Sequence, residues 1–349
     1  IFIYDWECIK MYNTNSGIVT FLVLLFIWLP NGLEAWNPDL RGIEYQVAKD
    51  IEIGGDKELL YFYRPVSLKH DDNNIFVLDD RDCVIKVFSK IGILRAVIGR
   101  PGDGPGELSS PSDMDIYQGK IYVADKAKVQ IYDKEGKDLG NFKLPLFIYK
   151  ILILDEDKII VSVIPLPHQN HEKLIYCFDN KGNLLWKCLD AFYSGDSVYD
   201  VFRNQIFLMN KSSEGFFVVK KAEDRNIYYF DREGKIKNKI SLSNEYSLKQ
   251  IEIPLKGGKK ELNVLCWDSD STRGLFYLLV PEYFNHKDIG LDLGPGQKVA
   301  VISGEGKLIR IIKLPDRLTK ISVDNDFIYG IDTSYSLRIM RIYDGAGKK

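Results

Sequence analysis

The sequence is poor in the residues and motifs from which common active sites are built. Its 349 residues include only four histidines and five cysteines. No two cysteines stand at C-x-x-C spacing, which argues against a zinc knuckle or a thioredoxin-like redox site. A G-x-S-x-G nucleophile elbow and an H-E-x-x-H zinc motif are also missing. The sequence therefore carries no catalytic signature, and we expect no bound cofactor.

An excess of charge of one sign is missing as well. Lys and Arg number 47, against 49 Asp and Glu. Without residues 1–35, which hold one basic and three acidic residues, 46 of each remain. Proteins that hold nucleic acid neutralise its phosphates with basic surfaces. The one short basic stretch is KGGKK at 256–260, so we expect no nucleic-acid partner. RNA binding stays an alternative that would need a basic face.

A single long apolar run lies near the N-terminus. Residues 18–29 (IVTFLVLLFIWL) carry no charge, but a helix needs about 20 residues to span a bilayer. The run fits the apolar region of a secretory signal that is cut after Ala35. We predict a leader over residues 1–35, with 11–35 as signal peptide and 1–10 preceding the true start at Met11. The alternative is a buried strand or an uncleaved anchor. Export would place the mature chain in the periplasm, at the cell surface or outside the cell, without a stable membrane span.

Helix-like periodicity is absent after this run, and a repeated hairpin takes its place. Apolar and polar residues alternate with period two, which is typical of half-buried strands. Each copy of the repeat is a strand that ends in three mostly polar residues and a glycine, and a second strand follows the turn. The Gly-to-Gly intervals are 44, 46, 52, 72 and 41 residues. The six copies are VFSKIG (87–92), IYDKEG (131–136), CFDNKG (177–182), YFDREG (229–234), VISGEG (301–306) and IYDGAG (342–347).

Two further strands precede most copies, as residues 112–133 show best (SDMDIYQGKIYVADKAKVQIYD). Four antiparallel strands at such regular intervals predict the blades of a β-propeller. The last copy ends without its fourth strand, and residues 44–55 supply an unpaired strand at the other end of the chain. That strand would complete the last blade and remove the exposed sheet edges. We therefore predict an all-β fold, a single six-bladed propeller of four-stranded blades over residues 36–349.

The glycine-rich stretch RPGDGPGELSSP (100–111) matches neither the dinucleotide-binding nor the P-loop phosphate template. Together with the strands that follow it, through IYVAD (121–125) and IYDKEG, it resembles an NHL repeat. The second blade matches that pattern closely, the first moderately, and the other blades keep mainly the hairpin. The repeat implies a fold and not an activity. As a whole, the chain resembles exported six-bladed propeller proteins of bacteria, many without an assigned activity. The repeat also implies that the stretch is a structural link between the first two blades.

The longer loops are predicted to gather on one face of the ring. In such a fold, the links between blades and the loops joining second to third strands share a face. The long segments of this kind are 99–111, 165–173, 244–262 and 281–297. Elaborate loops on a rigid scaffold usually carry binding functions. We therefore predict a non-catalytic binding or scaffold protein whose looped face recognises a protein, a peptide or a glycan.

Several side chains in these loops are candidates for ligand contact. Tyr283 and Phe284 could form a stacking platform, or they could pin their loop to the ring. A metal shared by the three loop histidines would lack the carboxylate or cysteine that usually completes a zinc site, so we assign no metal ligand. The candidate ligand-binding residues are Arg100, Asp103, His168, His171, Tyr283, Phe284 and His286.

Acidic residues end several predicted strands, namely Asp79, Asp125 and Asp332, and Asp115 lies on an inner strand. Carboxylates that line the axis could hold Ca²⁺, as in six-bladed lactonases. We therefore keep as the alternative a Ca- or Zn-dependent enzyme, either lactonase-like or similar to the peptide-amidating lyases. The same positions suit hydrogen bonds to turns, which is the interpretation we favour.

Overall fold

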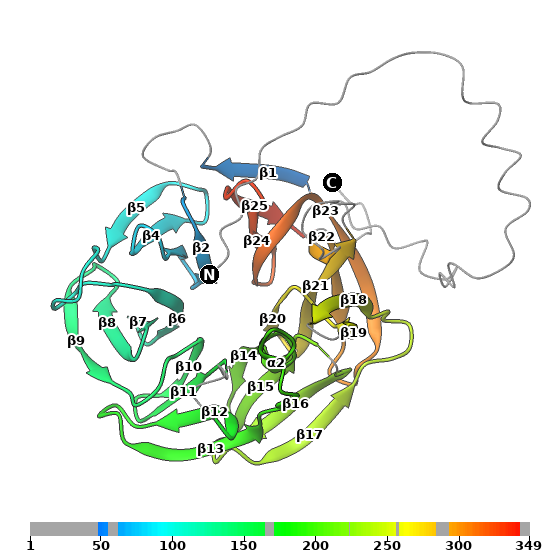
Figure 1. Cartoon of the computed structure of the whole chain (residues 1–349). Coiled ribbons are helices and arrows are strands. Elements are labelled where there is room, and N and C mark those ends of the chain that lie inside the picture. The colour runs from blue at the N-terminus through cyan, green and yellow to red at the C-terminus, as the bar shows by residue number, and fades with distance from the viewer. Residues whose placement is uncertain are drawn as a thin grey trace, which may run out of the picture. The chain divides into compact units, whose positions relative to one another are not determined.

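The computed structural model describes residues 48–54, 62–164, 171–222, 224–255, 258–283 and 293–342. In this part of the chain, antiparallel strands form six blades arranged in a ring (Figure 1). The predicted all-β, six-bladed propeller is confirmed. Residues 1–47 lie outside the described part, so the leader, the translation start and its cleavage stay predictions.

Blades one to four are separate four-stranded sheets whose strands pair in chain order. Blade one contains β2 (Pro65–His70), β3 (Asn74–Asp79), β4 (Val84–Ser89) and β5 (Leu94–Ile98). Blade two contains β6 (Pro111–Tyr117), β7 (Lys120–Asp125), β8 (Lys128–Asp133) and β9 (Asp138–Lys143). Blade three contains β10 (Lys150–Asp155), β11 (Lys158–Ser162), β12 (Lys173–Phe178) and β13 (Leu184–Asp190). Blade four contains β14 (Ile206–Ser212), β15 (Gly215–Lys220), β16 (Asn226–Asp231) and β17 (Ile236–Ser241).

Blades five and six share one long strand. Blade five starts with β20 (Asp268–Thr272), β21 (Leu275–Tyr283) and β22 (Leu293–Ile302). Its outer strand is the first part of β23 (Leu308–Val323), whose second part pairs with β24 (Phe327–Asp332). β25 (Leu337–Arg341) and β1 (Ala48–Ile53) complete blade six. Ile51 of β1 faces Ile339 of β25 in this pair, so the predicted closure of the ring by residues 44–55 is confirmed.

Two links between blades carry extra secondary structure. The helix α2 (Ser197–Asn204) lies between blades three and four, and Asp196 caps it by accepting the Val198 and Tyr199 N–H groups. With eight residues, α2 is shorter than the stretch of about ten residues in which a helical period can be recognised in a sequence. The hairpin of β18 (Lys249–Leu255) and β19 (Gly258–Val264) lies between blades four and five. The helix and the hairpin pack together through a small apolar cluster that includes Tyr199.

The main core lies between neighbouring blades, where each blade's sheet packs against the sheets on both sides. Strands of the inner positions are buried almost throughout, whereas the outer strands alternate between half-buried and exposed residues. The hairpin register in blade three places Ile175 opposite Cys188 and Cys177 opposite Trp186. The two thiols are therefore out of register for a bridge, as the sequence predicts, and both are free.

The repeated turn combines a side-chain hydrogen bond and a glycine of positive φ with one contact between blades. The residue three positions before the glycine accepts the N–H of the residue after it, as Asp179 does from Asn183 at 2.8 Å. The glycine itself has positive φ, +84° at Gly306. A Cβ on Gly306 would also lie 2.1 Å from the carbonyl oxygen of Ser241, at the end of the preceding blade's outer strand. The turn therefore doubles as a packing contact between neighbouring blades.

Buried aspartates fasten the links to the blades. Asp125 is almost fully buried and accepts the N–H groups of Ser109 and Ser110, at the end of the glycine-rich stretch. Asp79 likewise accepts N–H groups of the link before β2, and Asp332 accepts those of the Ser334–Ser336 turn. These three carboxylates hold turns and links, as the favoured interpretation predicts.

Candidate functional site: linking face and axial channel

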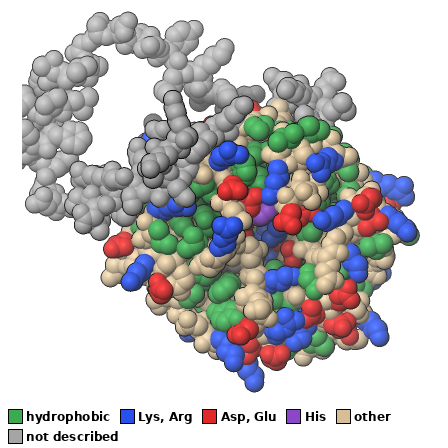
Figure 2. Space-filling model, turned by 180° about the vertical axis from the view of Figure 1, so that it is seen from behind, with side chains coloured by type: hydrophobic (Ala, Val, Ile, Leu, Met, Phe, Trp, Pro, Cys, Tyr) green, Lys and Arg blue, Asp and Glu red, His purple; other side chains and the backbone are tan. Residues whose placement is uncertain are grey.

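The two faces of the ring differ in the loops that form them. We call linking face the side that carries the links between blades and the loops joining second to third strands. These segments touch one another, since Ile148 of one link donates its N–H to Lys126 of such a loop at 2.8 Å. The tight-turn face lies on the other side (Figure 2). No helix of the described residues is long and apolar enough to cross a membrane.

Exposed aromatic side chains gather on the linking face. In the described part of the chain, four aromatic side chains are about half exposed: Tyr63 (48%), Phe147 (54%), Tyr193 (45%) and Tyr283 (52%). The first three lie in links between blades, and Tyr283 ends the second strand of blade five. The exposed aliphatic side chains mostly belong to outer strands and hairpin turns instead. Aromatic exposure is therefore a property of the linking face.

The predicted residues that the structure describes lie on this face, in its loops or, for Tyr283, at the end of a strand. Arg100 Nε is 3.0 Å from Glu107 within the glycine-rich stretch, and Asp103 lies 3.8 Å from Lys126 Nζ. Burial lowers the pKa of His171, whose carbonyl oxygen accepts the hydroxyl of Tyr193 at 2.8 Å. The hydroxyl of Tyr283 accepts the backbone N–H of Gln250. Tyr283 thus fixes its loop to the β18–β19 hairpin and still presents its ring to solvent.

Three predicted residues, His168, Phe284 and His286, lie outside the described residues. The histidine group and the Tyr283–Phe284 platform therefore stay predictions. Within the described ranges, no group of three or more His, Cys, Asp or Glu is placed to hold a metal ion.

The inner strands of blades two and five carry a pair of aspartates each. Asp113 and Asp115 accept N–H groups of Ile151 and Ile153 on the next inner strand, at 3.1 and 2.7 Å. Asp268 and Asp270 do the same to Ile321 and Val323, at 2.8 and 2.7 Å. Of these four aspartates, only Asp115 was predicted as an axial residue. The D-x-D spacing shared by both inner strands was the signal for the other three.

Lysines from the remaining blades balance these carboxylates. Lys150 Nζ lies 3.5 Å from Asp113, and Lys211 donates to the carbonyl oxygen of Ile153. Burial opposes the charge of Lys69, but Asp115 and the other axial aspartates raise its pKa overall. The lysines that line the channel are Lys69, Lys150, Lys211 and Lys320. Lys221 lies near them, since Lys320 and Lys150 help to lower its pKa. Since these ammonium groups surround the aspartates, the axial carboxylates do not fit a Ca²⁺ ion.

Two of the cavities that the described residues form lie along the axial channel. The one toward the linking face has a volume of about 40 Å³ and is lined by Lys150, Lys320, Asp113, Asp268 and Ser269 among others. The one toward the tight-turn face has about 110 Å³ and is lined by His70, Asp115, Lys211, Asp270 and Ser322 among others. Figure 2 shows a histidine among acidic and basic side chains near the centre of that face.

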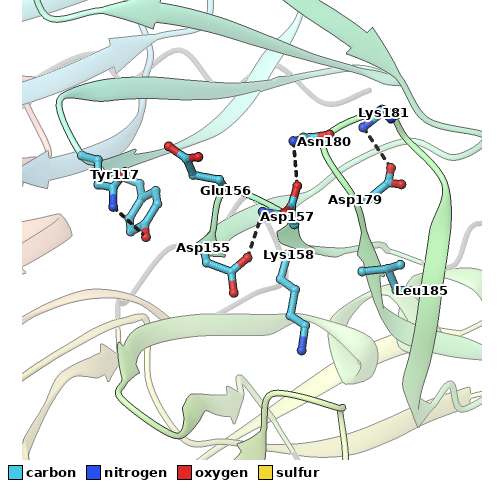
Figure 3. A pocket seen from close by; sticks show the side chains of 10 residues that line it. Tyr117, Asp155, Glu156, Asp157, Lys158, Asp179, Asn180, Lys181 and Leu185 are labelled. Atoms are coloured by element: carbon cyan, nitrogen blue, oxygen red, sulfur yellow. Dashed lines mark hydrogen bonds between the residues drawn. The ribbon is translucent and has the colours of Figure 1, made fainter.

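A larger hollow of about 580 Å³ lies between blades two and three on the tight-turn face. Figure 3 shows Asp155, Glu156 and Asp157 on one turn beside Asn180 on the next. Asp155 accepts the backbone N–H of Asp157, and Asn180 Nδ2 donates to the Asp157 carboxylate at 2.8 Å. These two carboxylates thus already hold the two turns in place.

Comparison with known proteins agrees with this architecture. A family described as a 6-bladed beta-propeller matches residues 58–198, and no curated protein sequence matches the chain. A Bacteroides fragilis protein described as exported aligns with TM-score 0.57 and 12% identity, over 86% of this chain and 96% of its own. Virginiamycin B lyase from Staphylococcus aureus aligns with TM-score 0.52 and 10% identity, over 86% of this chain and 100% of its own. A catalytically inactive variant of that lyase, solved with quinupristin, gives TM-score 0.51 and 11% identity, over 84% and 99%. At such identities these likenesses concern the fold alone. The chain is a six-bladed β-propeller.

Proposed function

We propose that this protein is an exported, non-catalytic propeller that binds a polypeptide partner through its linking face. The observation that carries the proposal is the placement of Tyr63, Phe147, Tyr193 and Tyr283 on that one face. Exposed aromatic rings are enriched in protein interfaces because they bury a large apolar area at a small entropic cost. The proposal includes no metal cofactor, and it keeps export as predicted from the leader.

The spacing of these rings favours a polypeptide over a sugar. Each ring belongs to a different link or loop, so together they border a broad surface around the axis. A single sugar stacks on one or two adjacent rings, whereas a protein segment contacts several separate ones. The scaffold below is rigid, and α2 and the β18–β19 hairpin add their own apolar cluster to this side. A glycan ligand is therefore treated as an outcome of the test.

The test uses a displayed random-peptide library panned against the purified chain, with a glycan array as a parallel arm. The linking-face variant changes the four exposed rings to Ser. A matched rim variant carries Ile91→Ser, Val97→Ser, Leu184→Ser and Ile236→Ser, at side chains of similar exposure on outer strands and turns. We expect selected peptides to lose at least about tenfold in affinity for the linking-face variant, since aromatic anchors dominate interfaces.

The rim variant should bind the same peptides as the unchanged protein. Circular dichroism of both variants checks that the propeller is intact. Peptides that bind both variants equally would contradict the assignment of the face. Glycans that bind while no peptide is enriched would contradict the assignment of the partner.

A further inference from the structure

Three lysines from different blades meet where the axial channel opens on the linking face. Lys150 begins β10, Lys320 lies on the blade-six part of β23, and Lys221 directly follows β15. Lys150 and Lys320 line the same 40 Å³ cavity. The ammonium group of Lys221 lies 4.4 Å from the ring centre of Trp267, the residue before β20. Repulsion from Lys320 and Lys150 reaches Lys221, so the three groups form one electrostatic cluster.

The carboxylates of this mouth do not neutralise the cluster. Asp113 is engaged by Lys150 and by the Ile151 N–H, and Asp268 accepts the N–H of Ile321. Among the described residues, no carboxylate oxygen lies within 4.0 Å of the ammonium of Lys221 or Lys320. Lys69, Lys150 and Lys320 line the cavity together with Asp113, Asp268 and Asp270, so its lining is balanced in charge. Lys221 beside it adds the fourth ammonium group and leaves a net charge of +1.

This excess charge is unfavourable in the unliganded protein. Burial lowers the pKa of Lys221 to about 8, and the neighbouring Lys320 adds to the effect. Burial also lowers the pKa of Lys320. A half-buried cation without a counter-ion costs free energy that a bound anion would return. Such perturbed groups in a cavity are typical of binding sites.

We propose that this mouth of the channel is a binding site for a carboxylate group, held by Lys150, Lys221 and Lys320. The net charge of +1 matches a monoanion. A phosphate monoester carries a charge of about −1.5 to −2 at pH 7, which exceeds the excess charge of this site. The Oγ of Ser269, which also lines the cavity, is buried without a hydrogen-bond partner among the described residues and is a further donor.

The size of the cavity limits what enters it. A cavity needs about 10–15 Å³ to hold one water molecule, so 40 Å³ has room for a carboxylate head group and little else. The rest of the ligand must lie outside, beside the ring of Trp267 and the linking face. We therefore expect carboxylates with an apolar body, such as propionate or benzoate, to bind better than inorganic anions.

The site is tested with free carboxylates, so it does not depend on the polypeptide partner proposed above. Sodium benzoate and sodium propionate are titrated into the chain at pH 7, with sodium chloride and benzamide at equal concentration as controls. The readouts are the melting temperature and the pKa of Lys221, followed by NMR of labelled lysine Nζ. We expect saturable stabilisation by the carboxylates alone and a rise in the pKa of Lys221.

Matched variants locate the effect. Lys221→Met and Lys320→Met should each weaken benzoate binding by at least about tenfold, because each removes a charged contact. Lys220→Met is the control. Lys220 is the neighbour of Lys221 in sequence, and burial lowers its pKa too, but the charges near it are those of Asp224 and Arg203. It should bind benzoate like the unchanged protein.

Three results would overturn the proposal. Chloride could stabilise the protein as much as benzoate, the pKa of Lys221 could stay constant at saturating benzoate, or Lys220→Met could weaken binding as much as Lys221→Met. The pKa readout uses the unchanged chain, so it holds even where a variant fails to fold. Peptides with free or amidated carboxyl groups then show whether a polypeptide supplies the carboxylate. Failure of peptide binding alone leaves the benzoate result intact.

Discussion

The imidazole Nδ1 of His70 lies 2.8 Å from the hydroxyl oxygen of Ser322, although the two residues are 252 positions apart. His70 ends the inner strand of blade one, and Ser322 belongs to the inner strand of blade six. The Ser322 hydroxyl also donates to Asp270 of blade five, at 3.3 Å. A chain of polar groups therefore joins three blades at the point where the ring closes.

This chain predicts that part of the stability depends on the charge of His70. Burial lowers the pKa of His70 below its usual 6.5, assisted by Lys90 and Lys69 and opposed by Asp270 and Asp324. In acid the unfolded chain therefore binds the proton more readily than the folded one, and stability falls as pH drops below about 6.5. His70→Gln should flatten this loss of stability between pH 7.5 and 5.

Urea unfolding at several pH values, with an NMR titration of His70, measures the effect. Burial raises the pKa of Asp270, so the folded chain takes up this proton more readily than the unfolded chain, which opposes the loss of stability in acid. Because both proteins contain Asp270, the comparison with His70→Gln isolates the effect of the histidine. A His70 pKa at or above 6.5, or equal slopes for both proteins, would disprove the prediction.

Lys221→Met should stabilise the protein at neutral pH. The pKa of Lys221 is about 8 in the folded chain against 10.5 for an ordinary lysine, so the unfolded chain binds more protons between these values. Wild-type stability therefore rises with pH from about 8 to 10.5, and the methionine variant lacks this rise. We expect a gain of roughly 1–3 kcal/mol at pH 7 that shrinks toward pH 10.5. Chemical denaturation measures it, with Lys181→Met on an exposed turn as a control of about zero effect.

Removing the Asp125 carboxylate should destabilise the second blade and its link. Asp125 is 1% exposed, accepts N–H groups of Ser109 and Ser110, and lies 3.1 Å from Lys128 Nζ. Asp125→Ala leaves these donors unsatisfied, which should cost about 2–4 kcal/mol. The exposed Asp72 offers a control, and Asp72→Ala should change the unfolding free energy by less than about 0.5 kcal/mol. Equal effects of the two changes would show that the buried carboxylate does not hold the link.

Two glycines separate the conformational role of a turn from its packing role. Gly119 and Gly306 both have positive φ, +75° and +84°. A Cβ on Gly119 would meet nothing within 4 Å, whereas on Gly306 it would lie 2.1 Å from the carbonyl oxygen of Ser241. Gly119→Ala should therefore cost about 1 kcal/mol for the backbone alone. Gly306→Ala should cost at least about 2 kcal/mol more, because the outer strand of blade four must move. Similar thermal shifts for both variants would refute this difference.

Most of the fold could be predicted because its signals are local. The alternation of apolar residues gives the strands, and the x-x-G turns give the hairpins. The register of Ile175 against Cys188 follows from the turn at 179–182. The helix α2 escaped prediction because eight residues are too short for a periodic pattern. The candidate site could be predicted only in part: Tyr283 is exposed on the linking face as expected, but the channel lysines carry no sequence motif.

The sequence by itself determined the strand order, the six blades and the closure of the ring, since these depend on neighbouring residues and on a repeat. Only the tertiary structure decided which charges meet at the axis. Lys150, Lys221 and Lys320 stand far apart in the chain and share no spacing. They converge because closure of the ring brings the starts of the inner strands and the loops after the second strands to the same mouth, where ammonium and carboxylate groups interact across a half-buried channel.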